Sequence, residues 1–299
     1  MAAHVEAPND AAALDAFFEK AGGWPVDTDT VAALAAFAAD ALKAGARVAL
    51  VTSGGTTAPL EKRTVRYVDN FSTGNRGAAL AEGLTGGYRV LYVHRTTAAF
   101  PFTRHVANKL SADPAGTMGG LLAGDMIEQL QQGVDALAGD AFLAVPFETV
   151  GQYLGLLRAA CTCLAPLGAE VLVVLAAAVS DFYVPDLHEH KIQSRVGGGL
   201  SLELAPVPKC LGFVKRWGSP HFCVFAFKLE TDEALLRAKA RACLSTYGLD
   251  GVVANLLATY RTRATVYTAA GERVAAGEDV DARLAEELVR VHAVRRGGA

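Results

Sequence analysis

Strong net charge, long apolar runs and a signal-like N-terminus are all missing from this chain of 299 residues. Its 28 basic and 31 acidic residues give a formal net charge of −3, which offers no overall field for nucleic acid or an anionic membrane. The longest strongly apolar run, Val171 to Val179, is far shorter than the roughly 20 residues that cross a bilayer. We therefore expect neither nucleic acid nor a membrane as a partner.

The N-terminal region carries Glu6, Asp10 and Asp15 where a secretory signal would carry positive charge before an apolar run. Cysteine is scarce, and its number is odd: Cys161, Cys163, Cys210, Cys223 and Cys243. All five fall in expected helices or strands, which suits reduced thiols better than a disulfide framework. Cys161 and Cys163 would face different directions on a helix, so packing is favoured over a metal or redox pair. We expect a cytoplasmic protein.

The chain is rich in small apolar residues instead. Hydrophobic residues make up 52% of it and charged residues 20%, so burial can offset the entropy lost on folding. Much of the apolar fraction is alanine, which favours closely packed helices. A single α/β domain over residues 1–299 is consistent with this length.

Strand-like and helix-like patterns alternate along the chain. Strands are expected over residues 48–52, 88–93, 141–145, 171–179, 200–204, 222–227 and 252–255. Helices are expected over residues 10–20, 31–43, 78–84, 150–167, 211–217, 232–247 and 280–291. The uninterrupted apolar character of residues 171–179 implies cover on both faces of that strand. This alternation predicts a Rossmann-like, mostly parallel sheet with helices on both faces.

Three segments depart from the rhythm. Residues 1–23 form an N-terminal extension, and the Gly-, Ala- and Met-rich residues 111–125 are predicted to be a surface insertion. Residues 182–199, which contain Pro185 and the run Gly197 to Gly199, are predicted to form a mobile flap.

The residues that follow each strand are the first place to look for a ligand site, because ligands gather at the carboxyl ends of strands in open α/β sheets. Thr52 to Thr57 form a Gly-rich turn that suits either a phosphate or a plain tight turn. Asp69 to Gly77 carry a stronger signal: Ser72 can cap a helix, two glycines expose backbone N–H groups, and Arg76 adds positive charge. We expect an anion at this helix N-terminus.

Other strand ends carry polar groups that allow two interpretations. Asp181, after Ala176–Val179, serves equally well as a loop cap or as a ligand contact. Phe227 and Asn255 could hold a base, although core packing explains the phenylalanine as readily. Lys191 in the flap is either a solvated charge or a lid residue that closes over phosphates.

Metal binding is not assigned to any residue. The flap sequence His188-Glu-His190 would suit zinc, but no cysteine or second histidine pair stands nearby at ligand spacing.

In their order along the chain, these motifs resemble the phosphopantothenoylcysteine synthetases, the ligases of coenzyme A biosynthesis. The resemblance runs from about Trp24 through the last helix. It rests on Val51-Thr-Ser-Gly-Gly-Thr56, Asp69-Asn-Phe-Ser-Thr-Gly74, Ala176-Ala-Ala-Val-Ser-Asp-Phe-Tyr-Val-Pro185, His190-Lys-Ile-Gln-Ser194, Pro206-Val-Pro-Lys209, Phe227-Lys-Leu-Glu-Thr-Asp232 and Val252-Val-Ala-Asn255.

The resemblance implies a reaction. In this family a nucleoside triphosphate activates the carboxylate of 4'-phosphopantothenate, and the amine of L-cysteine then attacks the acyl-nucleotide. No flavoprotein decarboxylase domain precedes the match, which suggests the free-standing, eukaryotic-type form that uses ATP with Mg²⁺, whereas the fused bacterial form uses CTP. The expected products are 4'-phosphopantothenoyl-L-cysteine, AMP and pyrophosphate.

The resemblance also implies roles for particular residues. The nucleotide would be bound by Gly54, Ser72, Gly74, Gly77, Phe227 and Asn255. Phosphopantothenate or the acyl-nucleotide would be held by Asn70, Ala177, Ala178 and Asp181. Asn70 and Lys191 would be the catalytic residues. Bacterial members carry Lys-x-Lys-Lys in the flap and this chain has Lys191-Ile-Gln-Ser, so Lys191 is the residue that matches.

The family also associates in pairs, so we expect a homodimer. The polar stretch from Pro59 to Val68 is long enough to extend across a two-fold axis and to bring Asn70 toward a neighbour's site.

Two other functions remain open at this stage. A nicotinamide-dependent reductase is disfavoured because the first turn is Ser-Gly-Gly-Thr and no acidic residue follows the second strand at the ribose-binding place. A non-enzymatic nucleotide-binding regulator would keep the glycine turns but would not need Asn70, Asp181 and Lys191.

Overall fold

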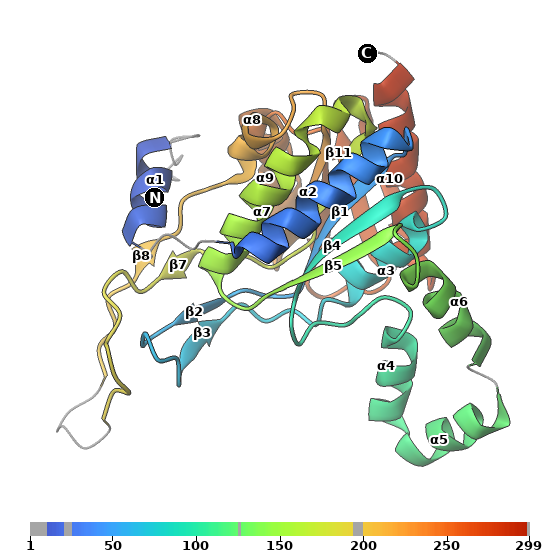
Figure 1. Ribbon diagram of the computed structural model, residues 1–299, viewed down its shortest axis with the longest axis horizontal. Coiled ribbons are helices and arrows are strands. Elements are labelled where there is room, and N and C mark those ends of the chain that lie inside the picture. Colours follow the sequence, from blue (N-terminus) through green and yellow to red (C-terminus); the bar gives the residue numbers. More distant parts are fainter. Residues whose placement is uncertain (1–10, 21–25, 125–126, 194–199, 298–299) are drawn as a thin grey trace.

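The central sheet organises the molecule. A computed structural model describes residues 11–20, 26–124, 127–193 and 200–297, and these residues form an eight-stranded sheet in the order β12-β11-β10-β9-β6-β1-β4-β5 (Figure 1). Six of the strands are parallel: β1 (Val48–Ser53), β4 (Arg89–Arg95), β5 (Phe142–Phe147), β6 (Val171–Leu175), β9 (Cys223–Glu230) and β10 (Gly251–Leu256). The antiparallel pair β11 (Arg263–Thr268) and β12 (Gly271–Ala276) completes one edge. The predicted α/β class is confirmed.

Helices cover both faces of this sheet because neighbouring strand residues point to opposite sides. Val48 and Leu50 pack into one core, and Ala49 and Val51 pack into the other. The first face is covered by α2 (Thr28–Lys43), α7 (Val150–Leu164), α8 (Val214–Trp217) and α9 (Glu233–Tyr247). The second face is covered by α3 (Asn75–Leu84) and α10 (Val280–Gly297), whose small residues allow close approach to the strands.

The N-terminal helix α1 (Ala11–Lys20) packs onto the first face rather than standing apart. Leu14 and Phe17 are buried, and the ring of Phe17 meets that of Tyr183 edge to face at 4.8 Å. Residues 1–10 and 21–23 of the expected N-terminal extension lie outside the described residues.

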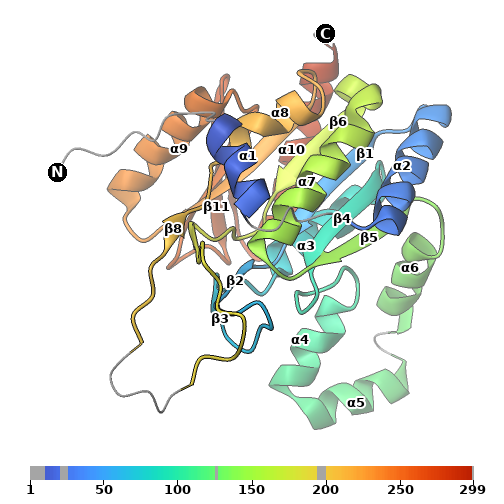
Figure 2. The ribbon, with the colours of Figure 1, turned by 60° about the vertical axis from the view of Figure 1, so that its left-hand side comes forward.

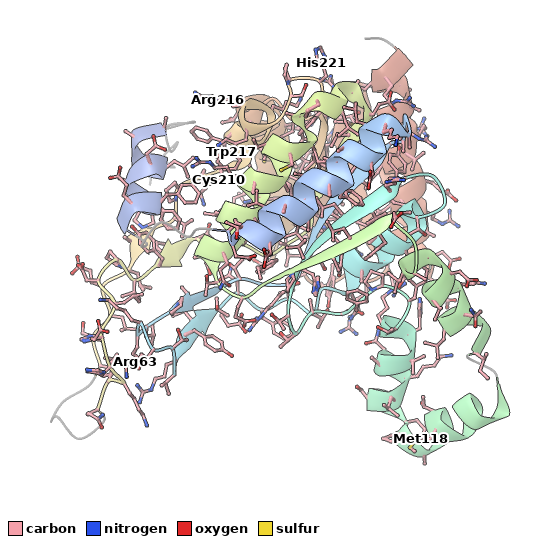
Figure 3. The ribbon with its side chains drawn as sticks, viewed as in Figure 1. Arg63, Met118, Cys210, Arg216, Trp217 and His221 are labelled. Atoms are coloured by element: carbon pink, nitrogen blue, oxygen red, sulfur yellow. The ribbon has the colours of Figure 1, made fainter. Side chains whose placement is uncertain are left out.

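Residues 104–124 and 127–137 form a helical excursion, α4 (Arg104–Ala112), α5 (Pro114–Ala123) and α6 (Ile127–Leu137), which projects from the body beyond β4 and β5 (Figure 2). It includes residues 111–124 of the predicted insertion, and residue 125 lies outside the described residues. Met118 lies at its far end, where its side chain is largely exposed (Figure 3). No helix of the described residues is both long and apolar enough to cross a membrane.

Two short ladders lie beyond the carboxyl edge of the sheet. They are β2 (Thr57–Pro59) with β3 (Tyr67–Asp69), and β7 (Phe182–Tyr183) with β8 (Ala205–Pro206). The β2–β3 hairpin is inserted between β1 and α3, so the expected strand–loop–helix unit carries a hairpin in its loop.

Two strand predictions are wrong in extent. The apolar run at 171–179 is a strand only to Leu175, because the backbone beyond it bonds the loop after β1 instead of a neighbouring strand. The strand expected at 200–204 is absent from the described residues there, and the short β8 follows at Ala205–Pro206. The β11–β12 hairpin was not predicted, since its outer strand is exposed at nearly every residue and has little apolar pattern.

Candidate active site

The loop after β1 forms the floor of the site. Its backbone runs beside the loop after β6: the N–H of Ala178 donates to the carbonyl of Gly54 at 2.8 Å, and the N–H of Thr56 donates to the carbonyl of Ala178 at 3.0 Å. Gly55 is required here by close approach, because a Cβ at this position would lie 1.6 Å from the carbonyl oxygen of Asn70. The glycine turn is therefore a packing element that joins three segments of chain.

Asn70 stands where these segments meet. Its backbone N–H donates to the carbonyl of Thr56 at 3.1 Å, and its side-chain Nδ2 donates to the carbonyl of Val179 at 2.8 Å. Ser180 closes the same junction through its N–H, which donates to Oγ1 of Thr56 at 2.8 Å. We call residues 54–57, 70–74 and 176–181 the loop cluster.

Asn70 belongs to the loop cluster of its own chain, and the tip of the β2–β3 hairpin is formed by residues 61–66. These contacts lie within one chain, so a role of Asn70 toward a neighbour's site stays a prediction.

The N-terminus of α3 lies beside the loop cluster. Gly74 is its N-cap residue, with a φ of 75° that favours glycine, and Ser53 Oγ donates to the Gly74 carbonyl at 2.9 Å. Gly77 packs directly against Ser53. Ser72 is not the helix cap that the sequence predicted, because its Oγ accepts from the N–H of Gly74 at 3.3 Å and shapes the turn before the helix.

Arg76 does not offer its charge to an anion, contrary to the sequence interpretation. Its guanidinium donates to Asp281 Oδ1 at 2.8 Å, to Asn255 Oδ1 and to the carbonyl of Tyr260. Arg76 thus ties α3 to β10 and to α10. Asn255 is buried, and the bond from Arg76 fixes which side of its amide accepts.

The loop after β6 presents both small residues and charge. Ala178 bonds the loop after β1, and the N–H of Ala177 donates to Oγ1 of Thr52, near the end of β1, at 3.3 Å. Asp181 is largely exposed, and its Oδ1 accepts from Lys209 Nζ at 2.7 Å. Lys209 is a partner that the sequence analysis did not assign, although it closes the Pro206-Val-Pro-Lys motif.

Phe227 lies on β9 beside Val253 of β10 and packs half-buried against the core on the α3 side of the sheet. β9, which carries Phe227, and β10, which carries Asn255, both end at the carboxyl edge of the sheet. The packing interpretation of Phe227 is thus correct, and a role in base binding stays a prediction.

A buried arginine that the sequence did not point to lies on the other side of the cluster. Arg95 ends β4 and is 8% exposed in its side chain, between Asp69 at 2.7 Å and Glu148 at 3.2 Å. Burial lowers the pKa of Arg95, but the two carboxylates outweigh burial and raise it. This triad holds β3, β4 and the start of α7 together next to Asn70.

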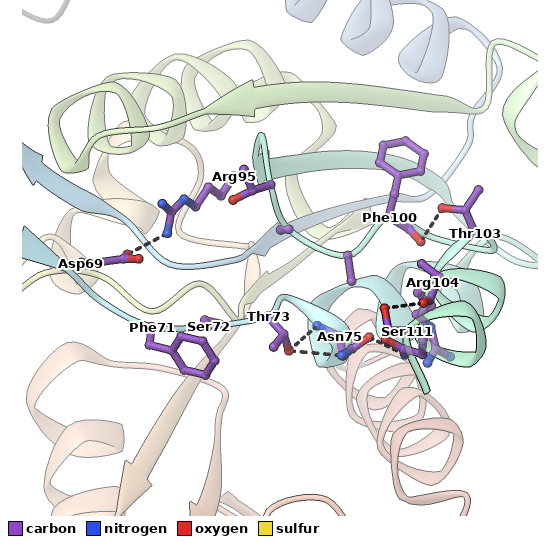
Figure 4. A pocket seen from close by; sticks show the side chains of 15 residues that line it. Asp69, Phe71, Ser72, Thr73, Asn75, Arg95, Phe100, Thr103, Arg104 and Ser111 are labelled. Atoms are coloured by element: carbon purple, nitrogen blue, oxygen red, sulfur yellow. Dashed lines mark hydrogen bonds and ion pairs between the residues drawn. The ribbon is translucent and has the colours of Figure 1, made fainter. Parts of the chain in front are cut away.

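A pocket of about 550 Å³ opens between the N-terminus of α3 and α4 (Figure 4). Its lining combines part of the loop cluster with the excursion: Asp69, Phe71, Ser72, Thr73, Asn75, Arg95, Thr97, Ala98, Ala99, Phe100, Thr103, Arg104, Ala107, Asn108 and Ser111. Asn108 Nδ2 donates to Asn75 Oδ1 at 3.1 Å, so the excursion is bonded to the helix N-terminus itself. Of the predicted site residues, Ser72 lines this pocket.

Lys191 is not brought to the loop cluster by the described contacts. Its side chain is exposed, and the residues around it bond the turn between β2 and β3: Lys62 N–H donates to the carbonyl of His188 at 2.8 Å, and Arg66 Nη1 donates to that of Ile192 at 3.1 Å. Figure 1 shows this part of the flap beside the hairpin, away from the sheet.

Residues 182–193 of the predicted mobile flap are bonded to β8 and to the hairpin. Their mobility stays a prediction. Residues 194–199 lie outside the described residues.

The structure therefore gathers most of the predicted residues. Gly54, Asn70, Ser72, Gly74, Gly77, Ala177, Ala178 and Asp181 lie in or beside the loop cluster, and Phe227 and Asn255 lie on the two strands next to it. The sequence missed Arg95, Asn75 and the α4 wall. Arg95 directly follows an apolar strand and could have been found by that position alone.

Comparisons with known proteins bear on this arrangement. A profile of the family described as the DNA/pantothenate metabolism flavoprotein C-terminal domain matches residues 109–291. The human phosphopantothenate–cysteine ligase is 41% identical over 87% of this chain and 90% of its own. The Arabidopsis thaliana phosphopantothenate–cysteine ligase 1 is 40% identical over 71% of this chain and 70% of its own. A solved structure of a Cab2 mutant in complex with phosphopantothenate–cysteine superposes with a TM-score of 0.84 at 29% identity, covering 95% of this chain and 99% of that one.

Proposed function

Because the chain belongs to the phosphopantothenate–cysteine ligase family, we propose that it joins 4'-phosphopantothenate to L-cysteine at the expense of ATP. The product would be 4'-phosphopantothenoyl-L-cysteine, an intermediate of coenzyme A biosynthesis. The observation that carries the proposal is the convergence of the loops after β1, β3 and β6 on Asn70, at the carboxyl edge of the sheet. We place the enzyme in the cytoplasm.

Two steps account for the products. First, a carboxylate oxygen of phosphopantothenate attacks the α-phosphorus of ATP, which forms an acyl-adenylate and releases pyrophosphate. The amine of cysteine then attacks the acyl carbon, and AMP leaves as the amide bond forms and the amine loses a proton. Neither step needs a nucleophilic side chain.

The chain's own groups would position the reactants. The first backbone N–H groups of α3, which follows Gly74, are suited to phosphate oxygens. Asn70 uses one amide hydrogen on the Val179 carbonyl, and its second is left for the oxygen of the activated acyl group. Asn255, oriented by Arg76, and Phe227 would hold the nucleoside, while Ala177, Ala178 and Asp181 would hold the acyl portion.

Mg²⁺ is proposed to arrive with the nucleotide. The described residues contain no group of three or more metal-ligating side chains, and Mg²⁺ in nucleotide sites is often held chiefly by the phosphates with one or two carboxylates. The ion would neutralise charge as the carboxylate and triphosphate approach.

A homodimer is also proposed. Exposed apolar side chains gather on the β2–β3 hairpin, its continuation and the start of the flap: Val65, Tyr67, Val68, Phe71 and Phe182. A patch of this kind marks a protein interface more often than bare surface. Light scattering of the purified protein tests the pairing, and a fully active monomer would contradict it.

The function is tested by pyrophosphate release on mixing the protein with phosphopantothenate, cysteine and either ATP or CTP at matched concentrations. We expect more pyrophosphate release with ATP than with CTP. We also expect no release when phosphopantothenate is left out. Nucleotide binding without release would favour a regulator. Reduction of a carbonyl substrate with NADPH would favour a reductase.

A further inference from the structure

A fully buried carboxylate lies outside the loop cluster, in the turn between β2 and β3. Glu61 has no exposed side-chain surface, although Arg63, two residues on, lies at the outer tip of the same turn (Figure 3). Burying a carboxylate is costly unless hydrogen bonds and opposite charge replace the lost water. Its partners therefore show what it holds.

Three of these partners belong to the turn. Glu61 Oε2 accepts from the N–H of Val65 at 3.2 Å and of Arg66 at 3.0 Å, and Oε1 accepts from Arg66 Nη1 at 2.7 Å. Burial raises the pKa of Glu61, but the backbone N–H groups and the guanidinium outweigh it and bring that pKa below its usual value. The group is a carboxylate at neutral pH.

The remaining bonds cross to the flap. The N–H of Ile192 donates to Glu61 Oε1 at 3.3 Å, and Arg66 Nη1 donates to the carbonyl of Ile192 at 3.1 Å. Both backbone polar groups of Ile192 are thus held by one ion pair. Ile192 directly follows Lys191, whose side chain stays exposed.

A second cross-link joins the same two segments but differs in kind. Lys62 Nζ lies 2.7 Å from Glu189 Oε2, with side chains 59% and 57% exposed. An exposed pair of this type contributes little, about 0–1 kcal/mol. The Glu61–Arg66 pair is the buried connection between hairpin and flap, and the Lys62–Glu189 pair is its natural control.

We propose that Glu61, together with Arg66, is a positioning residue that fixes the flap backbone at Ile192 and thereby sets the place from which Lys191 acts in the activation step. This inference rests on the proposed function. The resemblance implies that Lys191 would close over phosphates with its long side chain, so a backbone held at the next residue limits where the ammonium can reach. Loss of the clamp would leave Lys191 present but misplaced.

A double-mutant cycle on pyrophosphate release separates this role from a purely structural one. Glu61→Gln keeps the shape of the side chain but removes its charge. Its amide NH₂ group would also face N–H groups that now donate to the carboxylate. We expect it to slow release on the order of tenfold to a hundredfold, the loss typical of a small misplacement of a catalytic group. In a Lys191→Gln background the same change should have no further effect, because nothing is left to position.

Two more variants complete the design. Arg66→Gln alters a half-exposed residue and removes the bond to the Ile192 carbonyl, so it should repeat the result if Glu61→Gln folds poorly. Lys62→Gln breaks only the exposed pair and should release pyrophosphate at the wild-type rate. Thermal unfolding of each variant reports folding separately.

The outcomes divide cleanly. A slow Glu61→Gln enzyme whose defect vanishes in the Lys191→Gln background supports the clamp. Wild-type release by both Glu61→Gln and Arg66→Gln would overturn it. So would a double variant of Glu61→Gln and Lys191→Gln whose rate falls by the product of the two single effects. A Lys191→Gln enzyme with a normal rate of release would also overturn it. Failure of the wild-type chain to release pyrophosphate at all would instead overturn the proposed function.

Discussion

The loop cluster and the flap are held in place by different means. The loop cluster is fixed by backbone hydrogen bonds between buried segments and by a glycine that leaves no space for a side chain. The described part of the flap is fixed by a two-residue ladder, a backbone bond from Lys62 to His188, one buried carboxylate with its arginine, and one exposed ion pair. Changes in the first region should therefore affect folding and turnover together, and changes of exposed side chains in the second should affect turnover with little effect on folding.

The largest expected effect is that of Gly55→Ala. The added Cβ would meet the carbonyl oxygen of Asn70 at 1.6 Å, and backbone on both sides prevents an easy shift. We expect a loss of at least about 3 kcal/mol in the free energy of unfolding, at the upper end for overpacking, together with nearly complete loss of activity. Chemical denaturation and pyrophosphate release measure the two effects.

Gly86→Ala is the matched control, because nothing lies within 4 Å of a Cβ there. It should be neutral within roughly 0.5 kcal/mol. A Gly55→Ala protein as stable and active as this control would show that the loop cluster is not rigid.

Asn70→Ala should follow in size. Nucleotide binding is expected to survive, while turnover falls by roughly two to three orders of magnitude, as for the loss of one donor that acts in the transition state. Asn70→Asp should be worse, since it places a carboxylate against the Val179 carbonyl, which now accepts from Nδ2 at 2.8 Å. Nucleotide affinity by calorimetry and single-turnover release give the comparison, and wild-type turnover in the alanine variant would assign Asn70 to loop packing alone.

Lys191→Gln is the test in the flap. The side chain is exposed, so the free energy of unfolding should change by less than about 0.5 kcal/mol. Pyrophosphate release should slow by about two orders of magnitude if the ammonium neutralises charge on the phosphates. Unfolding curves and release rates measured side by side decide this; unchanged release would return Lys191 to the interpretation as a solvated surface charge.

Arg76→Gln should have the smallest effect on the chemistry. Without the guanidinium the amide of Asn255 loses the bond that orients it, so the KM for nucleotide should rise about tenfold while kcat stays within about twofold, the pattern of lost uniform binding. Arg290→Gln, which removes the pair between the exposed Arg290 and Glu287 on α10, away from Asn255, is its control. A fall in kcat with an unchanged KM would place Arg76 in the reaction step instead.

The same contrast explains what could be predicted from the sequence. The parallel strands and their helices were predicted because an apolar run such as Val171–Leu175 indicates by its own residues that the segment is buried. The roles of Arg76 and Glu61 could not be predicted from the sequence. Arg76 bonds Asp281 and Glu61 bonds Ile192, and both partners are far away in the chain. A charged residue at a helix start has the same local pattern whether it binds an anion or another part of the protein.

The loop after β6 shows the same limit from the other side. Ala176–Val179 continue the apolar run, so the sequence predicted more strand. In the structure their backbone bonds the loop after β1 and the side chain of Asn70. Composition could not distinguish these partners from a neighbouring strand.

The proposed activation passes through an acyl-adenylate held at the loop cluster. The most direct test uses phosphopantothenate labelled with ¹⁸O in its carboxylate, ATP and cysteine, with mass analysis of the nucleotide product. We expect AMP that carries one ¹⁸O atom in its phosphate, because a carboxylate oxygen stays on the adenylyl phosphorus when cysteine displaces the AMP. Unlabelled AMP, or ADP with the label in inorganic phosphate, would contradict it.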